Sequence, residues 1–238
     1  MTLDEILDSL EHDIAVRDDG LFAGRAIIDG RCVDVIGVSR GAFVGVDEAL
    51  WLSAQVMETI RRGGDTPILV IVDSGSQRMS RRDELLGLNE CLAHLAKCLM
   101  LAGQCGHQTV GLLYGHTAAG AFIATALATR VLVALPGATP EVMDLPSMSR
   151  VTKLSIDLLE DMAKSTAVFA PGLVNLEKMG AVNATLDPAQ PLAAQLARWF
   201  DVQPDRADVR DRLGESHGGR PVAARIAQRV YELARHVG

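Results

Sequence analysis

The sequence is short of positive charge. Its 238 residues carry 23 Lys and Arg against 30 Asp and Glu, which gives a formal charge of −7, and the pI is about 5.3. A protein that binds a nucleic-acid backbone needs clustered basic side chains that displace counterions from the phosphates. We therefore expect no nucleic-acid partner.

Long apolar runs are missing as well. Arg, Asp, Gln or Gly interrupts every apolar stretch before it reaches the ~18 residues that a membrane span requires. The first residues, MTLDEILDSLEHD, are acidic and amphipathic, unlike the basic start and apolar run of a secretory signal. We expect a cytoplasmic protein with no membrane span, and 48% apolar residues suffice for a sizeable core.

Cysteine is scarce, and the four present are too few for a disulfide framework in a chain of this length: Cys32, Cys91, Cys98 and Cys105. Cys91, His94 and Cys98 follow one another at helical spacing, with His107 just beyond, so a metal site has to be considered. Cysteine packs like a small apolar residue, however, and leucines dominate this segment. We expect core packing there and no metal ion.

Nucleotide-binding motifs are absent too. The glycine-containing segment GHTAAG lacks the GxxxxGK[ST] pattern of a phosphate-binding loop, and no GxGxxG is followed by an acidic residue at a strand end. The sequence offers no support for an ATP or NAD site.

Strand and helix patterns alternate through residue 136. Asp29-Gly30 is a favoured pair for a two-residue turn and predicts an antiparallel hairpin over residues 21–39. Ser80, with Asp83 three positions later, is typical of a helix start. The further elements that we expect are a helix over about 1–20, helices over 47–63, 80–102 and 121–129, and strands over 67–73, 108–114 and 130–136. This order predicts an α/β fold of ββα and βαβ units on a mostly parallel sheet.

The C-terminal part reads differently. From about residue 140 the pattern is helical, with helices expected over 150–164, 172–180, 189–200 and 218–236 and a short extended piece, AVNATLD, between the second and third. The segment DVQPDRADVRDRLGESHGGR is predicted as a solvated connector. We expect one domain over residues 1–238, whose helical tail packs on its own sheet or on a partner.

Two segments are candidates for chemistry, because layered α/β proteins place their sites beyond the carboxyl ends of strands. The first is Asp73-Ser74-Gly75-Ser76-Gln77, directly after an apolar strand. The second, residues 115–120, is Gly-His-Thr-Ala-Ala-Gly, which we expect to form a tight turn leading into an apolar helix. Small residues there allow a ligand to approach backbone N–H groups, as an oxyanion site requires. Close packing of helix against strand, or an ordinary Ser- and Gly-rich loop, would select the same residues.

Three stretches carry a family resemblance. SGSQRMSRRDELLGLNECLAHL, GHTAAGAFIATALATRVLVALPGA, and SRVTKLSIDLLEDMAKS followed by FAPGLVNLEKMGAVNATLD resemble the crotonase-like superfamily. Within it they are similar to the carboxyltransferase-type gamma subunits of malonate decarboxylase. The match spans roughly residues 20–200, and its most specific piece is RRDELLGLNECL.

The resemblance implies a layered crotonase-like fold and a lyase subunit that pairs with a beta subunit. Such an enzyme decarboxylates malonyl thioester held on the phosphopantetheine-type arm of an acyl carrier subunit, or passes the carboxyl group to biotin. The chain itself is expected to bind no cofactor. The residues implied as catalytic, through their backbone N–H groups, are Gly75, Ser76, Gln77, Ala119 and Gly120. Those implied in substrate contact are His116, Thr117, Ala118, Arg81 and Arg82.

Two departures accompany the resemblance. Ala119-Gly120 stands where the family often has Ser-Gly, and residues 141–149, EVMDLPSMS, lack the expected His-Val-Met-Gly-like run. Two other functions stay open, an acyl-thioester hydrolase with Thr117 as nucleophile and a non-catalytic scaffold subunit. His116 is a candidate proton donor, although we favour an orientation toward solvent or partner. Biotin dependence, oligomer size and the division of labour between the two segments stay undecided.

Overall fold

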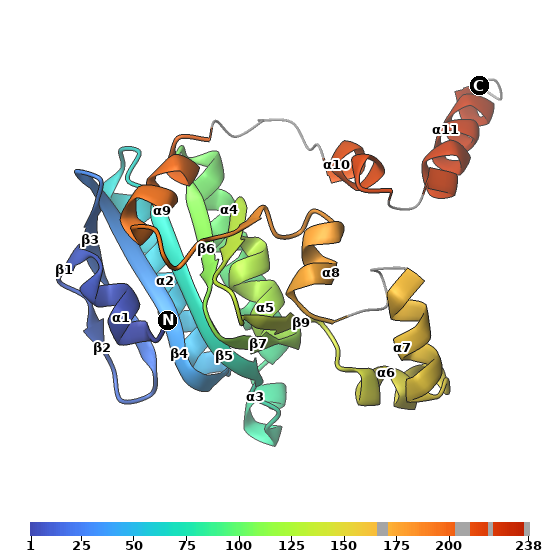
Figure 1. Cartoon of the computed structure of the whole chain (residues 1–238), viewed down its shortest axis with the longest axis horizontal. Helices are drawn as coiled ribbons and strands as arrows, with labels where there is room; N and C mark the ends of the chain where they lie inside the picture. The colour runs from blue at the N-terminus through green and yellow to red at the C-terminus, as the bar shows by residue number, and fades with distance from the viewer. Residues whose placement is uncertain (166–170, 203–209, 219–220, 236–238) are drawn as a thin grey trace.

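A computed structural model describes residues 1–165, 171–202, 210–218 and 221–235. Within this part of the chain the main sheet runs in the order β1-β3-β4-β5-β6-β8-β10, with β2 also paired to β3 (Figure 1). β3 is antiparallel to β1, β2 and β4, whereas β4, β5, β6, β8 and β10 pair in parallel. The expected α/β fold with a mostly parallel sheet is confirmed.

The strands are β1 Glu11–His12, β2 Ala15–Val16, β3 Leu21–Ile28, β4 Arg31–Val44, β5 Ile68–Gln77, β6 Thr109–Leu113, β7 His116–Ala118, β8 Val131–Ala134, β9 Thr139–Glu141 and β10 Ala184–Thr185. The helices are α1 Leu3–Asp8, α2 Val46–Arg62, α3 Arg81–Leu85, α4 Leu88–Gln104, α5 Ala119–Ala124, α6 Leu145–Thr152, α7 Ile156–Ser165, α8 Leu173–Lys178, α9 Leu192–Phe200, α10 Arg210–Ser216 and α11 Pro221–Arg235, with a short 3₁₀ turn at Ala126–Ala128.

The central sheet is covered on both faces. Helices α2, α4 and α5 lie on one face, and α1 and α9 lie on the other (Figure 1). Strand residues alternate between the faces, so Val70 and Val72 of β5 pack with the first group of helices, while Leu69 and Ile71 pack with the second. All four side chains are at most 1% exposed. A strand buried on both faces has to be a continuous apolar run, which is why PILVIV could be recognised from the sequence.

The predicted hairpin is confirmed. β3 and β4 pair from Leu21↔Val38 to Ile28↔Arg31, and the connecting Asp29 and Gly30 have φ of 51° and 76°. Left-handed backbone at both central residues is what a tight hairpin turn requires, and Asp and Gly tolerate it best.

Three expected helices are each divided in the structure. The segment 80–102 forms α3 and α4, because the chain turns at Gly87, whose φ is 82° and which tolerates the left-handed region without steric cost. The segment 150–164 forms α6 and α7, separated at Lys153 with φ 64°. The helix expected over 121–129 is also divided: α5 begins earlier, at Ala119, and ends at Ala124, and the 3₁₀ turn Ala126–Ala128 follows it.

Three further boundaries were wrong. The N-terminal helix ends at Asp8, and residues 11–16 contribute β1 and β2 to the edge of the sheet. β5 continues through Gln77 instead of ending at Asp73. Part of the predicted connector over 201–220 is the helix α10, while its residues 203–209 and 219–220 lie outside the described part of the chain.

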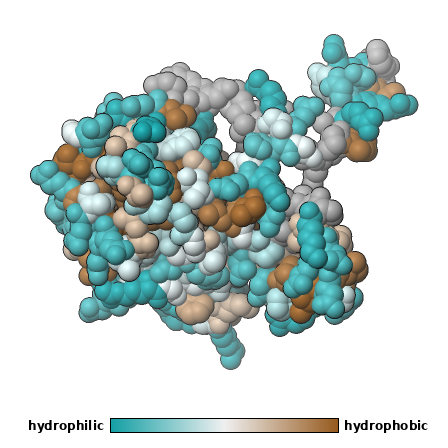
Figure 2. All heavy atoms as spheres, viewed as in Figure 1, coloured by the Kyte–Doolittle hydropathy of each residue, from teal (hydrophilic) through white to brown (hydrophobic). Residues whose placement is uncertain are grey.

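The C-terminal helices expose apolar side chains. On α6 and α7 these are Val151, Ile156 and Leu158, and on α11 they are Val222, Ile226, Val230, Tyr231 and Leu233, each at least 40% exposed. Figure 2 shows apolar surface gathered over the pair α6 and α7. Among the described residues, no helix combines the length and the apolar character that crossing a membrane takes.

Candidate functional site

The two segments singled out in the sequence lie side by side. Three side chains of β5 contact the second segment at a constant separation of 43 residues. Asp73 Oδ1 accepts the N–H of His116 (3.1 Å), the hydroxyl groups of Ser74 and Thr117 hydrogen-bond (2.7 Å), and Gln77 Oε1 accepts the N–H of Gly120 (2.8 Å). The two segments are therefore brought together beyond the apolar part of β5 and the end of β6, and Gln77 is the predicted catalytic residue of the first segment that hydrogen-bonds to the second.

The first segment is a strand extension and not a loop. Ala42 of β4 pairs with Ser74 and Val44 with Gln77, with a register shift before the first of these pairs and another between them. Gly75 fits closely against this strand, since a β-carbon there would lie 3.0 Å from the Gly41 carbonyl oxygen and from the Phe43 ring. Packing against β4 therefore favours glycine at position 75, whatever its N–H binds.

The second segment was expected as a tight turn, but residues 116–118 form β7, which pairs in parallel with β9 in a separate two-stranded sheet. The hydroxyl group of Thr139, on β9, is hydrogen-bonded to His116 Nδ1 (3.2 Å). The His116 side chain is exposed. Thr117 is completely buried. The local sheet, which depends on pairing 23 residues away, explains why a short-range turn pattern was misleading.

Backbone strain accompanies the start of α5. Ala119 has φ 50°, a left-handed conformation that costs a residue with a β-carbon about 1 kcal/mol or more. Ala118, Ala119 and Gly120 are half-buried. α5 itself is only six residues long, so any stabilisation of negative charge here has to come from individual N–H donors and not from a long helix dipole.

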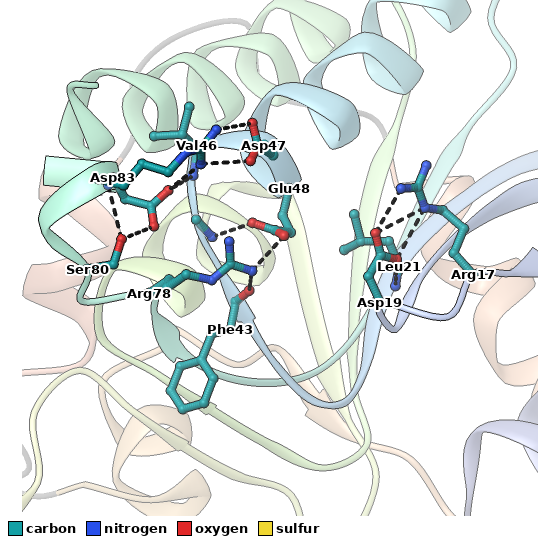
Figure 3. A network of polar contacts seen from close by, with 12 residues as sticks. Arg17, Asp19, Leu21, Phe43, Val46, Asp47, Glu48, Arg78, Ser80 and Asp83 are labelled. Atoms are coloured by element: carbon teal, nitrogen blue, oxygen red, sulfur yellow. Dashed lines mark hydrogen bonds and ion pairs between the residues drawn. The ribbon is translucent and has the colours of Figure 1, made fainter. Parts of the chain in front are cut away.

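A polar network anchors the end of β5 to the start of α2 (Figure 3). Arg78, next to Gln77, donates to Glu48 (2.6 Å), and Glu48 accepts the N–H of Gly45 (2.9 Å). Asp83 accepts the N–H of Val46 (3.1 Å) and hydrogen-bonds to Ser80. The Ser80 hydroxyl, then the Val46 N–H, hold the pKa of the Asp83 carboxyl below its ordinary value. The helix start at Ser80 was predicted, but the contact of Asp83 with α2 was not.

The two candidate arginines differ in their surroundings. Arg82 forms a two-point ion pair with Asp47 (2.8 and 3.2 Å), as the sequence could not reveal. Arg81 is exposed, and its side chain forms no hydrogen bond or ion pair within the described part of the chain. Arg81 is therefore the cation of this pair that is available to an external anion.

The cysteine-containing segment lies in α4. Cys98 is buried, and its Sγ lies 3.5 Å from His94 Nε2. Burial raises the pKa of the Cys98 thiol. Across the described ranges, no group of three or more His, Cys, Asp or Glu side chains is placed to hold a metal ion.

Comparison with known proteins adds a family. A family model described as malonate decarboxylase gamma subunit matches residues 39–234. The chain is also 26% identical over 208 residues to the malonyl-S-ACP:biotin-protein carboxyltransferase of Malonomonas rubra, a match that covers 79% of this chain and 71% of that protein.

Solved structures agree in fold. A Pseudomonas malonate decarboxylase hetero-tetramer in complex with coenzyme A contains a chain 28% identical to this one, with a TM-score of 0.75 and 94% of both chains covered. The Pseudomonas MdcD-MdcE hetero-dimer gives 25% identity and a TM-score of 0.70, over 92% of this chain and 93% of that one. Transcarboxylase 12S, at 15% identity and a TM-score of 0.64 over 80% of this chain and 38% of that one, shares the fold.

Proposed function

The chain belongs to the malonate decarboxylase gamma subunit family, and from this membership we propose that it forms, with a beta subunit, a site that decarboxylates malonyl thioester on an acyl carrier subunit. The products are acetyl thioester and carbon dioxide. On this proposal the enzyme is a lyase, and the Ala119-Gly120 backbone is the part of this chain that binds the reacting oxygen.

The proposed chemistry needs charge stabilisation more than a strong base. The bond between the carboxylate and the α-carbon breaks, and its electron pair spreads onto the thioester oxygen as an enolate. Carbon dioxide leaves, and a proton is then added to the α-carbon. Each N–H donor aimed at the enolate oxygen is worth about 3 kcal/mol of barrier in a site that excludes water.

The observation that carries the proposal is the contact between Gln77 and Gly120. The Gly120 N–H is satisfied by a side-chain oxygen, 2.8 Å away, and not by the backbone of the fold. A side chain can rotate aside, so this donor can be transferred to a ligand without unfolding an element. On the same proposal the backbone of Gly75, Ser76 and Gln77 contributes the second group of donors, for the carboxylate.

The partner and the carrier follow from the relatives. One solved relative is a hetero-dimer and another a hetero-tetramer in complex with coenzyme A. We propose a beta-type partner subunit for this chain and a phosphopantetheine-type arm as the carrier of its substrate. Arg81, exposed and without a partner in the described part of the chain, is suited to a phosphate group on that arm.

The proposed function is tested with Gly120→Val in the complex reconstituted with its partner. A β-carbon at Gly120 would lie 3.1 Å from Gln77 Oε1 and from Leu92, so valine fills the space beside the N–H without removing a titratable group. We expect the decarboxylation rate to fall at least 100-fold, the usual effect of losing one oxyanion donor. Gly103→Val is the control, because an added β-carbon there meets nothing within 4 Å. Unchanged turnover of Gly120→Val would overturn the assignment.

Transfer of the carboxyl group to biotin is the second candidate, favoured by the similarity to the Malonomonas rubra enzyme. The two functions share the enolate and differ in what receives the carboxyl group. Labelled carboxyl recovered on a biotinylated acceptor, and removed by avidin, would identify the transferase. Label recovered only as carbon dioxide would identify the simple decarboxylase.

Hydrolysis by Thr117 gains no support from the geometry. Its hydroxyl is fully buried and bonded to the Ser74 hydroxyl, with no His or Asp side chain of the described residues bonded to it. A nucleophile needs an adjacent base. The Gly120→Val experiment distinguishes a non-catalytic scaffold subunit from a subunit whose backbone takes part in catalysis.

A further inference from the structure

The side chain of Gln77 occupies the N–H that the proposed reaction needs. Its Oε1 lies 2.8 Å from the Gly120 nitrogen and 3.1 Å from where a Gly120 β-carbon would be. Chemically this oxygen is a neutral carbonyl held in the place of a substrate oxygen. The two residues meet because β5 extends to Gln77 alongside β7 and the start of α5.

Neutral and charged oxygens differ as competitors for this donor. Nitrogen shares its lone pair with a carbonyl more strongly than sulfur does, so an amide oxygen is at least as good an acceptor as a thioester oxygen. Exchange of Gln77 for an intact malonyl thioester therefore gains little. The enolate oxygen carries negative charge, and hydrogen bonds to charged acceptors are roughly twice as strong as neutral ones. Only the charged oxygen displaces Gln77 with a net gain.

We propose that Gln77 is a specificity-determining residue that withholds the Gly120 N–H from the bound substrate and releases it to the enolate. This inference rests on the proposed function and adds to it a resident competitor supplied by the chain itself. Because the Gln77 bond is kept when the substrate binds and is broken only as the enolate forms, the N–H contributes nothing to substrate binding. Gln77 therefore keeps KM high, and the barrier falls by the difference between the enolate bond and the Gln77 bond.

The surroundings allow the exchange. Gln77 is half-buried, so its side chain is not fixed in the core. Two other contacts keep the segment in place when Gln77 leaves, namely Asp73 with the His116 N–H and Ser74 with Thr117. The strained Ala119 therefore keeps its conformation without Gln77.

The test begins with Gln77→Leu in the reconstituted complex, since leucine has similar size and no acceptor. We expect KM for malonyl-carrier to fall about 2- to 10-fold, the factor for one net hydrogen bond, because the thioester oxygen then meets a vacant donor. We expect kcat/KM to rise by the same factor, because no competitor has to be displaced on the way to the enolate. The affinity for acetyl-carrier, whose thioester oxygen is neutral, should rise by the same factor. Gln77→Asn, one methylene too short to reach Gly120, should behave alike and serves if the leucine variant fails to fold.

The second part of the test replaces Gln77 with a charged competitor. Gln77→Glu places a carboxylate of the same length against the N–H, and this anion competes with the enolate. We expect kcat/KM to fall about tenfold or more at neutral pH and to recover as the pH is lowered and the carboxyl is protonated. A purely structural role for Gln77 would produce no such pH profile.

The outcomes separate this inference from the proposed function. Loss of kcat/KM in Gln77→Leu with KM unchanged, wild-type kinetics in both variants, or a pH-independent loss in Gln77→Glu would each overturn the competitor role. If Gly120→Val abolishes decarboxylation at the same time, the proposed function stands without it. If Gly120→Val keeps full turnover, both fail together.

Discussion

At the scale of the residue, Asp83 shows how one carboxylate serves two helices. It lies in α3, accepts the N–H of Val46 at the start of α2 and is only 1% exposed. A buried carboxylate is tolerated when hydrogen bonds replace its water. Here they also tie α2 to the chain just after Gln77, so the conformation of the candidate site depends on them.

Asp83→Asn should make the stability of the protein less dependent on pH. The pKa of Asp83 is lowered by its hydrogen bonds, so its contribution is fully present above the ordinary Asp pKa of about 4 and is lost as pH falls through the lowered value. We expect the variant to lose about 1 to 3 kcal/mol at pH 7 and the difference from wild type to shrink below about pH 4. Urea unfolding at a series of pH values measures this.

The control for Asp83→Asn is Asp65→Asn, because Asp65 is exposed and forms no hydrogen bond with the described residues. It should change stability by less than about 0.5 kcal/mol at any pH. A loss in Asp83→Asn that is equal at pH 7 and pH 3 would contradict the assignment.

Residue patterns located the candidate site but not its contacts. Gly75, Gln77, Ala119 and Gly120 could be singled out because small and polar residues follow apolar strands. That Gln77 reaches Gly120, and that Arg82 is tied to Asp47, depends on the packing of segments 35 to 43 residues apart. No local pattern encodes such a contact.

At the scale of the element, the pairing of β3 with β4 places a large side chain opposite a glycine. Phe22 faces Gly37 across the two strands, and a β-carbon at Gly37 would collide with the Phe22 ring and with the backbone carbonyl of Ile71 in β5. The ring fills the space left by the missing side chain, so the glycine lets an aromatic residue cover the sheet.

Gly37→Ala should destabilise the protein by about 1 to 3 kcal/mol, the cost of overpacking a filled core. The opposite is expected of Gly103→Ala in α4, where a β-carbon meets nothing within 4 Å and the backbone is helical. That variant should gain about 0.5 to 1 kcal/mol. Thermal or urea unfolding of both variants decides, and a neutral Gly37→Ala would contradict the packing argument.

Elements were predictable where their signal is local. The apolar run of β5, the Asp29-Gly30 turn and the amphipathic α2 all carry their pattern within a few residues. The continuation of β5 to Gln77 and the existence of β7 were missed, because both depend on distant partners in β4 and β9. The break at Lys153 was also missed, since a single left-handed lysine leaves no pattern in the sequence.

At the scale of the whole molecule, the net charge does not favour binding of the proposed carrier. The net charge of −7 repels an anionic phosphopantetheine arm at long range. Attraction therefore has to be local. The apolar side chains exposed on α6, α7 and α11 give the molecule further surface that a partner subunit would bury, consistent with the proposed pairing.

Arg81→Gln and Arg82→Gln separate local attraction from overall charge. Each variant removes one positive charge, so the long-range repulsion of the carrier is the same in both. Arg81 is free to meet a phosphate, whereas Arg82 is already paired with Asp47. We expect Arg81→Gln to lower kcat/KM for malonyl-carrier about 2- to 10-fold at low ionic strength, the factor for one hydrogen bond, and Arg82→Gln to lower it less. The gap should narrow near 1 M salt, where the screening length is only about 3 Å. Equal effects of the two substitutions at low salt would show that the carrier senses only the net charge and that Arg81 makes no contact with it.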